Sequence, residues 1–259
     1  MSYQSQAAAT PIPDVSLVVP VYNESHRIGL CLERLTSWAA SRPERIEIVV
    51  VDDGSTDDTS LIAERWIDLF PFITVLREPH RGKANSVLTG LAFARGTIVG
   101  FLDVDLATPI ETWDATADAF RRGADVVIAS REGPGARRIG EPWYRHAMGR
   151  AFNGLIRLTL LPGIHDTQCG FKFFSHAALT TILPRTRLYR RSGTVTRARV
   201  TAFDVELLYI ARCHRLRLAI VPVTWTYGEH TKVNPFTDTL QNVRDVLQVR
   251  VNGWLSLYR

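Results

Sequence analysis

The chain has 259 residues, 46% hydrophobic and 22% charged, a composition typical of a globular core that excludes an intrinsically disordered protein. Its formal net charge of +5 is a mild excess, which permits an anionic partner such as a phosphate, an acidic lipid or a nucleic acid but does not demand one. We expect no nucleic-acid partner. The three cysteines (Cys31, Cys169 and Cys213) are far apart and odd in number, so they argue against a disulfide framework and for a reducing, cytoplasmic compartment.

Residues 1–14 contain neither a charged n-region nor an apolar h-region, so we expect a flexible segment there and no signal peptide. No later stretch approaches the roughly 18 uninterrupted apolar residues that cross a bilayer. The sequence therefore predicts a soluble or peripheral protein with a single folded domain over residues 15–259, and it does not give the oligomeric state.

Strands and helices alternate along the first half of the chain. Apolar runs of strand length predict strands over residues 15–21, 46–53, 72–78, 97–105 and 124–130. Amphipathic stretches between these runs predict helices over residues 24–40, 57–70 and 83–94. Continuous apolar strands separated by helices indicate an α/β fold, in which a mostly parallel central sheet is covered by helices on both faces.

The pattern becomes less regular after Arg131, where glycine and proline are frequent. The arginine-rich segment (residues 185–199) contains six arginines and either forms a solvated loop or contacts anionic lipid headgroups. The remaining apolar patterns predict a helix over 204–213, a strand over 216–225 and an amphipathic helix over 236–259. The apolar residues of this last helix either pack in the core or lie at a membrane interface, and both alternatives stay open.

Polar and acidic residues follow three of the predicted strands. Tyr22 and Glu24 follow the first strand, Asp53 ends the second, and Asp103 and Asp105 end the fourth. Because ligands of open α/β sheets bind beyond the carboxyl ends of the strands, we expect these side chains to line one site.

The Asp-Val-Asp sequence at residues 103–105 has two interpretations. In the first, its carboxylates form a turn and cap the next helix. In the second, alternate residues beyond a strand point the same way, so both carboxylates hold a hard divalent cation such as Mg²⁺ together with substrate phosphates. The apolar strand before Asp103 and the presence of Asp53 on the same edge favour the metal.

Turn and helix-cap signals follow the second predicted strand. Gly54 suits a turn, and the three polar residues after it suit the cap of the next helix. These roles leave Asp52 and Asp53 unexplained, and a carboxylate here suits a ribose hydroxyl or a base N–H. The first strand lacks a dinucleotide-binding glycine pattern, and the stretch around Lys83 is not a P-loop.

Four motifs, in this order and spacing, resemble the nucleotide-sugar half of family-2 glycosyltransferases with the GT-A fold: VVPVYNE, VVVDDGSTDDT, RGKANSVLTG and FLDVDLATP. Three later motifs resemble dolichyl-phosphate β-glucosyltransferases and, more loosely, polyprenyl-phosphate mannosyltransferases: DTQCGFKFF, FDVELLYIA and VPVTWTYGEHTKV. The resemblance covers nearly the whole chain from Val15. It implies a Rossmann-like GT-A domain with a nucleotide-sugar half (15–130), an acceptor half (131–235) and a C-terminal amphipathic helix.

The resemblance implies a metal-dependent, inverting transfer of glucose from UDP-glucose to a polyprenyl or dolichyl phosphate. Asp103 and Asp105 would bind Mg²⁺ or Mn²⁺, which bridges the diphosphate of the donor, and with Arg131 they would form the catalytic set. The residues that would contact the nucleotide sugar are Pro20, Tyr22, Glu24, Asp53, Arg81, Lys83, Asp103 and Val104.

The acceptor would be gripped by arginines. Arg131 and Arg145 match arginines that hold the lipid phosphate in the similar enzymes, and the guanidinium fork can bond two phosphate oxygens. A phosphate acceptor is ionised at neutral pH, so the enzyme must mainly align it with the anomeric carbon. Lys232 would close over the phosphates. Four more residues either shape the sugar or acceptor site or make structural hydrogen bonds: Asp166, Gln168, Asp204 and Glu206.

Two other hypotheses remain. One keeps the chemistry with GDP-mannose, another UDP-sugar or a different acceptor, and the other is a non-catalytic nucleotide-sugar-binding protein. The complete Asp-Val-Asp and nucleotide motifs disfavour the second of these. We expect the enzyme to make peripheral contact with the cytoplasmic face of a membrane.

Overall fold

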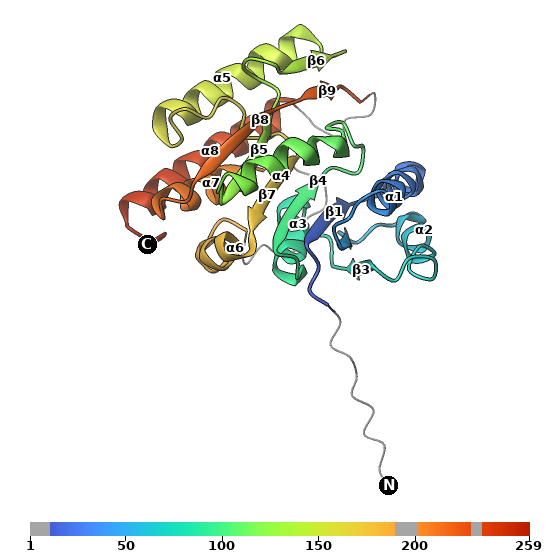
Figure 1. The fold of residues 1–259 in the computed structure, drawn as a ribbon. Helices are drawn as coiled ribbons and strands as arrows, with labels where there is room; N and C mark the ends of the chain where they lie inside the picture. Colours follow the sequence, from blue (N-terminus) through green and yellow to red (C-terminus); the bar gives the residue numbers. More distant parts are fainter. Residues whose placement is uncertain (1–10, 190–200, 229–234) are drawn as a thin grey trace.

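The computed structural model describes residues 11–189, 201–228 and 235–259, with the backbone alone over 235–240. The predictions on residues 1–10, on most of the arginine-rich segment and on Lys232 therefore lie outside the described residues. Figure 1 shows a central sheet with helices on both sides. In the part of the chain that the structure describes, no helix is both long and apolar enough to cross a membrane.

The central sheet has seven strands in the order β3-β2-β1-β4-β7-β5-β8. Their bounds are β1 Val15–Val21, β2 Ile46–Asp52, β3 Ile73–Arg77, β4 Ile98–Leu102, β5 Val126–Ser130, β7 Phe171–Ser175 and β8 Leu218–Pro222. β7 pairs antiparallel with both of its neighbours, β4 and β5, and the other neighbouring strands pair in parallel. The mostly parallel α/β sheet that the sequence predicted is confirmed.

Two hydrophobic cores lie on the two faces of this sheet. The helices are α1 Ser25–Ala40, α2 Thr59–Glu64, α3 Lys83–Phe93, α4 Trp113–Arg121, α5 Trp143–Thr159, α6 His176–Ile182, α7 Phe203–Cys213 and α8 Pro235–Trp254, with short 3₁₀ turns η1 Ile110–Thr112 and η2 Leu183–Arg185. Side chains alternate along a strand, so Leu17 and Val19 enter the core under α1, α2 and α4. Val18 enters the core under α3 and α5–α8.

Two expected elements differ in the structure, and one strand is additional. The strand predicted over 216–225 is two strands: β8, and β9 (Thr224–Thr226), which leaves the central sheet and pairs in parallel with β6 (Arg137–Ile139). Val223 joins them, because its N–H donates to Ser130 O in one sheet and its carbonyl accepts from Arg137 N in the other. The helix predicted over 57–70 ends at Glu64, and the chain beyond it turns into a cluster of aromatic rings. β7 was not predicted.

Candidate active site

The antiparallel direction of β7 brings two halves of the chain to one edge of the sheet. The carboxyl ends of β1, β2, β4 and β5 share this edge, and β7 begins there. The loop before β7 therefore lies beside the residues that follow β4, and Asp103 N donates to Gly170 O at 3.1 Å. A Cβ added at Gly170 would lie 1.9 Å from Asp103 Oδ2, so only glycine leaves room for this carboxylate.

Asp103 and Asp105 stand together at this edge with a lysine. The Lys83 ammonium lies 2.5 Å from Asp103 Oδ1, and Asp105 accepts a hydrogen bond from Ala107 N at 3.1 Å. Leu106, which lies between Asp105 and Ala107, has a φ of 49°, a left-handed conformation that leucine seldom adopts. Burial by the surrounding protein, and then the negative charge of Asp103, raise the pKa of the Asp105 carboxyl. The two carboxylates therefore share one electrostatic environment.

This donor set fits a divalent cation that a substrate helps to bind. Among the described residues, no three histidine, cysteine or acidic side chains converge to form a complete protein-made metal site. Mg²⁺ is commonly held by one or two carboxylates while phosphates and water supply the other oxygens. A bound cation would offset the repulsion between these two neighbouring carboxylates.

Asp53 holds the loop that leads into α3. Its carboxylate is 3% exposed and accepts hydrogen bonds from the backbone N–H groups of Arg81 (2.8 Å) and Gly82 (2.9 Å). His80 Nδ1 lies 2.8 Å from the same carboxylate, and the His80 ring stacks on Tyr22 with centroids 3.9 Å apart. These contacts fix the direction in which Lys83 leaves the loop. A direct contact between Asp53 and a nucleoside stays a prediction.

The neighbouring carboxylate, Asp52, has a structural role that the sequence left unexplained. It accepts hydrogen bonds from Ser55 N at 3.0 Å and from the Ser55 and Ser60 hydroxyls, so it closes the turn and joins β2 to α2. Gly54 in this turn has a φ of 74°, which glycine adopts without strain. The expected turn at Gly54 is confirmed.

The other residues that were predicted to bind the nucleotide-sugar donor lie around this edge. Pro20 is buried in β1 opposite Val51, and Val104 packs half-buried between the two aspartates against the core under α1. Glu24 is 8% exposed at the start of α1 and forms an ion pair with Arg27 at 3.3 Å. Arg81 is half-buried. Their contacts with a nucleotide sugar stay predictions.

Arg131 is held by Asp166 in a two-pronged ion pair. Arg131 Nε lies 2.7 Å from Asp166 Oδ2 and Nη2 lies 2.8 Å from Oδ1, while the Arg131 backbone N–H also donates to Oδ2. Burial alone would raise the pKa of Asp166, but the charge and hydrogen bonds of Arg131 hold it well below its usual range. The guanidinium also lies 5.1 Å from the ring centroid of Trp225. Asp166 and Trp225 thus fix the orientation of Arg131.

Two further predicted acceptor residues come from the segments around Arg131. Arg145, in the first turn of α5, lies over the Tyr227 ring at 5.6 Å. Gln168 donates its backbone N–H to Asp166 at 3.3 Å, and its side-chain amide nitrogen is buried without a hydrogen-bond partner in the described structure. A buried amide donor of this kind normally has a partner, and contact of Gln168 with the sugar or the acceptor stays a prediction.

Asp204 and Glu206, two residues apart on α7, point to different sides of the helix and have different surroundings. Asp204 forms an ion pair at 2.9 Å with Lys172, a lysine of β7 that is fully buried. Glu206 accepts hydrogen bonds from Leu188 N at 3.1 Å and Tyr258 Oη at 2.8 Å, which favours the structural alternative for this residue. Lys172 was missed by sequence reasoning, although a single lysine within FKFF was a usable signal.

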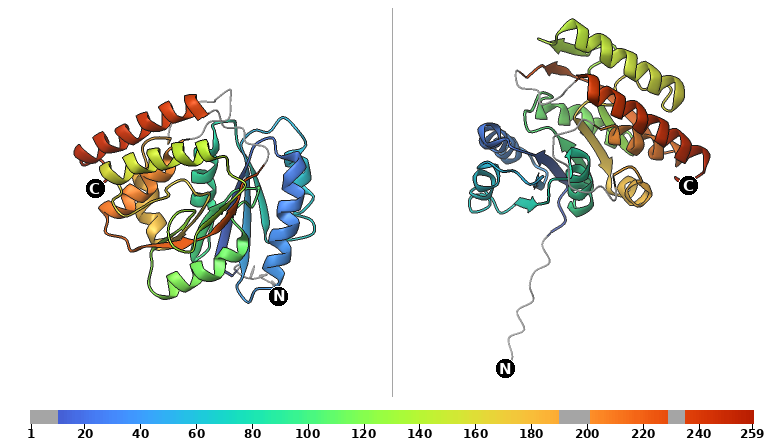
Figure 2. Two further views of the ribbon diagram at one scale, coloured as in Figure 1. Left: turned by 90° about the horizontal axis from the view of Figure 1, so that it is seen from above. Right: turned by 180° about the vertical axis from the view of Figure 1, so that it is seen from behind.

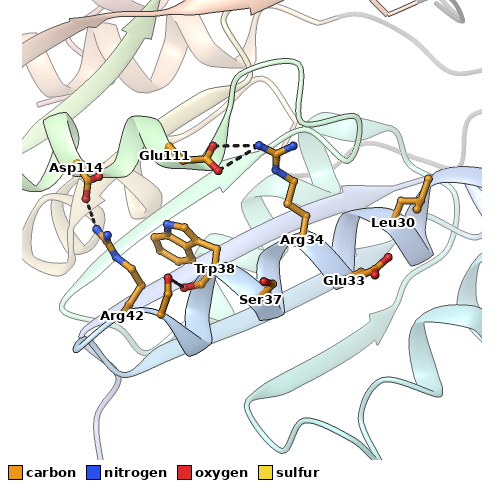
Figure 3. A pocket seen from close by; sticks show the side chains of 9 residues that line it. Leu30, Glu33, Arg34, Ser37, Trp38, Arg42, Glu111 and Asp114 are labelled. Atoms are coloured by element: carbon orange, nitrogen blue, oxygen red, sulfur yellow. Dashed lines mark hydrogen bonds and ion pairs between the residues drawn. The ribbon is translucent and has the colours of Figure 1, made fainter.

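A separate groove lies between α1 and the η1–α4 segment (Figure 3). It has a volume of about 640 Å³, and none of the predicted site residues lines it. Its charged residues are largely paired with one another: Arg34 lies 3.1 Å from Glu111, and Arg42 pairs with Asp114. Four of the five charged residues that line the groove are therefore matched by an opposite charge, and Glu33 is the fifth.

Comparison with known sequences gives one family. A sequence model of the family described as Glycosyl transferase family 2 matches residues 16–183. The chain is 30% identical over 267 residues to the dolichyl-phosphate beta-glucosyltransferases of Mus musculus and Homo sapiens, covering 96% of this chain and 79% of each relative. The Saccharomyces cerevisiae dolichyl-phosphate beta-glucosyltransferase is 29% identical, over 95% of this chain and 76% of its own length.

Solved structures share the fold. A mannosyltransferase from Pyrobaculum calidifontis in complex with GDP-Man and Mn²⁺ superposes with a TM-score of 0.61 at 22% identity, over 95% of this chain and 65% of that longer one. Glucosyl-3-phosphoglycerate synthase from Mycobacterium tuberculosis, in complex with Mn²⁺ and UDP-glucose, gives 0.60 at 19% identity, over 93% and 78% of the two chains. The expected GT-A resemblance is confirmed, and the chain belongs to glycosyl transferase family 2.

Proposed function

We propose that this chain is a metal-dependent, inverting glucosyltransferase that moves glucose from UDP-glucose to a dolichyl or other polyprenyl phosphate. One observation carries the proposal: two groups of charged side chains lie at the same edge of the sheet. The first is the carboxylate pair with its lysine (Asp103, Asp105 and Lys83), and the second is the guanidinium of Arg131, held by Asp166. The names of the relatives that align over nearly all of the chain support the choice of glucose and dolichyl phosphate.

The nucleotide-sugar half supplies the donor side of the site. Asp103 and Asp105 would hold Mg²⁺ or Mn²⁺, which supplies positive charge to the departing diphosphate. Tyr22 and Asp53, joined through His80, shape the nucleoside end of the site. Lys83 adds a second positive charge beside the metal ligands, so the leaving UDP departs as a stabilised anion.

The acceptor half positions the lipid phosphate. Arg131, oriented by Asp166, binds the phosphate, with Arg145 as the second cation and Gln168 as an amide donor. One ionised phosphate oxygen forms a bond with the anomeric carbon while the bond from that carbon to the UDP oxygen breaks on the opposite side. The electron pair leaves with UDP, the configuration inverts, and no proton has to be removed from the acceptor.

Transfer of radiolabelled sugar to a short polyprenyl phosphate tests this proposal directly. UDP-glucose is expected to label the lipid, with loss of labelling when EDTA removes the metal. Labelling from GDP-mannose or another UDP-sugar alone would support the second hypothesis. Binding of nucleotide sugars without any transfer, to lipid phosphates or to other acceptors, would support the non-catalytic alternative.

Replacing Asp53 by alanine is expected to weaken UDP binding by about 1–3 kcal/mol, because the N–H groups of Arg81 and Gly82 lose their acceptor and the loop before Lys83 loses its anchor. Isothermal titration of UDP in the presence of Mn²⁺ measures the change. Asp57→Ala is the matched control, since its carboxylate caps the neighbouring turn through Thr59. Unchanged UDP affinity in a folded Asp53→Ala protein would restrict Asp53 to turn structure.

Two neighbouring helices offer an apolar face for peripheral contact with a membrane. α5 and α8 lie side by side on the outside of the acceptor half (Figures 1 and 2). Large apolar side chains are exposed on them at helical spacing: Trp143, Leu155, Leu158, Leu247, Val251 and Trp254. Arg150 and Arg157 are exposed on the same helix as Trp143, and they would meet anionic headgroups.

Replacing Trp143 and Trp254 together by serine is expected to lower the fraction of protein that floats with vesicles containing anionic lipid, since these side chains are 82% and 69% exposed. The control is Leu61→Ser, which removes a side chain that is 54% exposed on α2. Equal flotation of all three proteins would remove the membrane role of these helices.

The location at the cytoplasmic face is supported by three unpaired cysteines and is tested by protease digestion of sealed vesicles.

A further inference from the structure

Lys83 contacts the proposed metal site before any ligand binds. Its ammonium lies 2.5 Å from Asp103 Oδ1, and the two side chains are 42% and 36% exposed. Lys83 begins α3 and Asp103 follows β4, so each is placed by its own element. This ion pair can therefore open without disturbing the fold around it.

A metal that coordinates Asp103 Oδ1 would compete with the lysine for this oxygen. Asp103 Oδ2 lies against the backbone of Gly170, where an added Cβ would approach it to 1.9 Å. The Asp103 backbone N–H donates to Gly170 O at 3.1 Å, which restrains the residue further. Oδ1 is thus the oxygen turned toward Lys83, and a cation that coordinates it has to displace the ammonium.

The charges around Lys83 indicate when this displacement is favourable. Lys83 pairs with Asp103, and Asp105 and Asp204 place two further carboxylates near its ammonium. Asp204 is itself paired with Lys172, and the cluster of these five side chains holds three carboxylates and two ammonium groups. A divalent cation alone would reverse the net charge of the cluster, whereas a cation that arrives with a diphosphate would not.

We propose that Lys83 is an internal counter-cation of the metal site, which occupies Asp103 in the free enzyme and moves onto the diphosphate when metal and nucleotide bind together. This inference deepens the proposed function and rests on it. Metal alone must displace the ammonium without giving it another partner, while the nucleotide supplies that partner. Metal and nucleotide therefore promote each other's binding, and by linkage the factor is the same in both directions.

The experiment compares Mn²⁺ binding to the wild-type protein and to Lys83→Met, with and without saturating UDP, by the loss of the electron paramagnetic resonance signal of free Mn²⁺. Lys83→Met is expected to bind Mn²⁺ alone about fivefold more tightly, because its competitor is gone. With UDP present it is expected to bind Mn²⁺ about fivefold more weakly. Arg65→Met is the control, since Arg65 is an exposed cation on the same half of the chain.

The opposite signs of the two changes are the signature of the proposal, since a merely structural role would shift both in one direction. Unchanged or weaker binding of Mn²⁺ alone by Lys83→Met overturns the proposal. Lys83→Gln is a second variant for the same measurement, and circular dichroism spectra check that both variants are folded. These measurements need no acceptor, so failure of sugar transfer would refute the proposed function without changing the Mn²⁺ result. Absence of Mn²⁺ binding to the wild type with either UDP or GDP overturns both.

Discussion

Replacing Asp103 by asparagine is expected to lower kcat for sugar transfer about a hundredfold or more, the range seen when a group that stabilises developing charge is removed. The amide keeps the size of the side chain and loses the negative charge that would hold the metal against the diphosphate. Asp105→Asn is expected to act in the same direction. The rate of transfer of radiolabelled glucose at saturating donor, over a series of Mn²⁺ concentrations, measures both effects.

The control for this pair is Asp68→Asn, which removes one exposed carboxylate from the same half of the chain. Raising the Mn²⁺ concentration is expected to recover part of the lost rate in Asp105→Asn. Full activity of the wild type in EDTA, or an Asp103→Asn enzyme with unchanged kcat, would contradict a metal role for these carboxylates. The first result would leave charge stabilisation to Lys83 and to the arginines.

The parallel part of the sheet was predictable because each of its first strands is a continuous apolar run that ends in polar residues. Val49, Val50 and Val51 are all fully buried, alternately in the two cores, which is why the run shows no polar alternation. The same pattern located the site, since Asp53 and Asp103 follow such runs directly. The spacing of apolar residues along a short stretch, and the polar residues that end it, are enough to predict these strands and their carboxyl ends.

The antiparallel strand was not predictable from local pattern. β7 reads FKFFS, and its lysine made the run look unlike a central strand. Lys172 is buried there because Asp204, from α7, neutralises it at 2.9 Å, and its ammonium also donates to Cys169 O at 2.5 Å. A partner 32 positions away in the chain cannot be inferred from one sequence, because a buried charge is tolerated only when tertiary structure supplies its counter-ion.

The roles of individual acidic residues were less predictable than their location. Asp52 and Asp53 are adjacent in sequence and equally buried, yet one closes the turn to α2 and the other anchors the loop before α3. Strand alternation sends the two side chains to opposite sides, and this decides which loop each one meets. The sequence placed both at the site edge without separating these functions.

Breaking the ion pair of Arg131 with Asp166 is expected to cost much folding stability, which the sequence did not predict. The two side chains are 16% and 0% exposed, and removing one partner of a buried pair leaves the other uncompensated. Asp166→Ala is therefore expected to lower the free energy of unfolding by about 3–5 kcal/mol. Urea denaturation at pH 7 measures it, and Asp125→Ala, which breaks a more exposed pair with Arg217, is the control.

The pH dependence of this loss has a defined sign. The pKa of Asp166 is depressed in the folded state, so the contribution of the pair is fully present above the unfolded carboxyl pKa of about 3.9 and is lost as pH falls below it. The difference in unfolding free energy between the wild type and Asp166→Ala is expected to be constant from about pH 5 to 7 and to shrink below about pH 4. A difference that stayed constant at pH 3 would contradict an ionic origin.

Replacing Arg131 by lysine separates stability from acceptor binding. The ammonium keeps a positive charge beside Asp166, so the protein is expected to fold, but it cannot bond two oxygens of a phosphate at once. The KM for polyprenyl phosphate is expected to rise about tenfold to a hundredfold, while UDP affinity is unchanged. Arg138→Lys is the matched control, because Arg138 lies over the same Trp225 ring at 5.9 Å and pairs with Glu141 at 2.6 Å. An equal loss of UDP affinity would instead place Arg131 on the donor diphosphate and leave the lipid phosphate to Arg145.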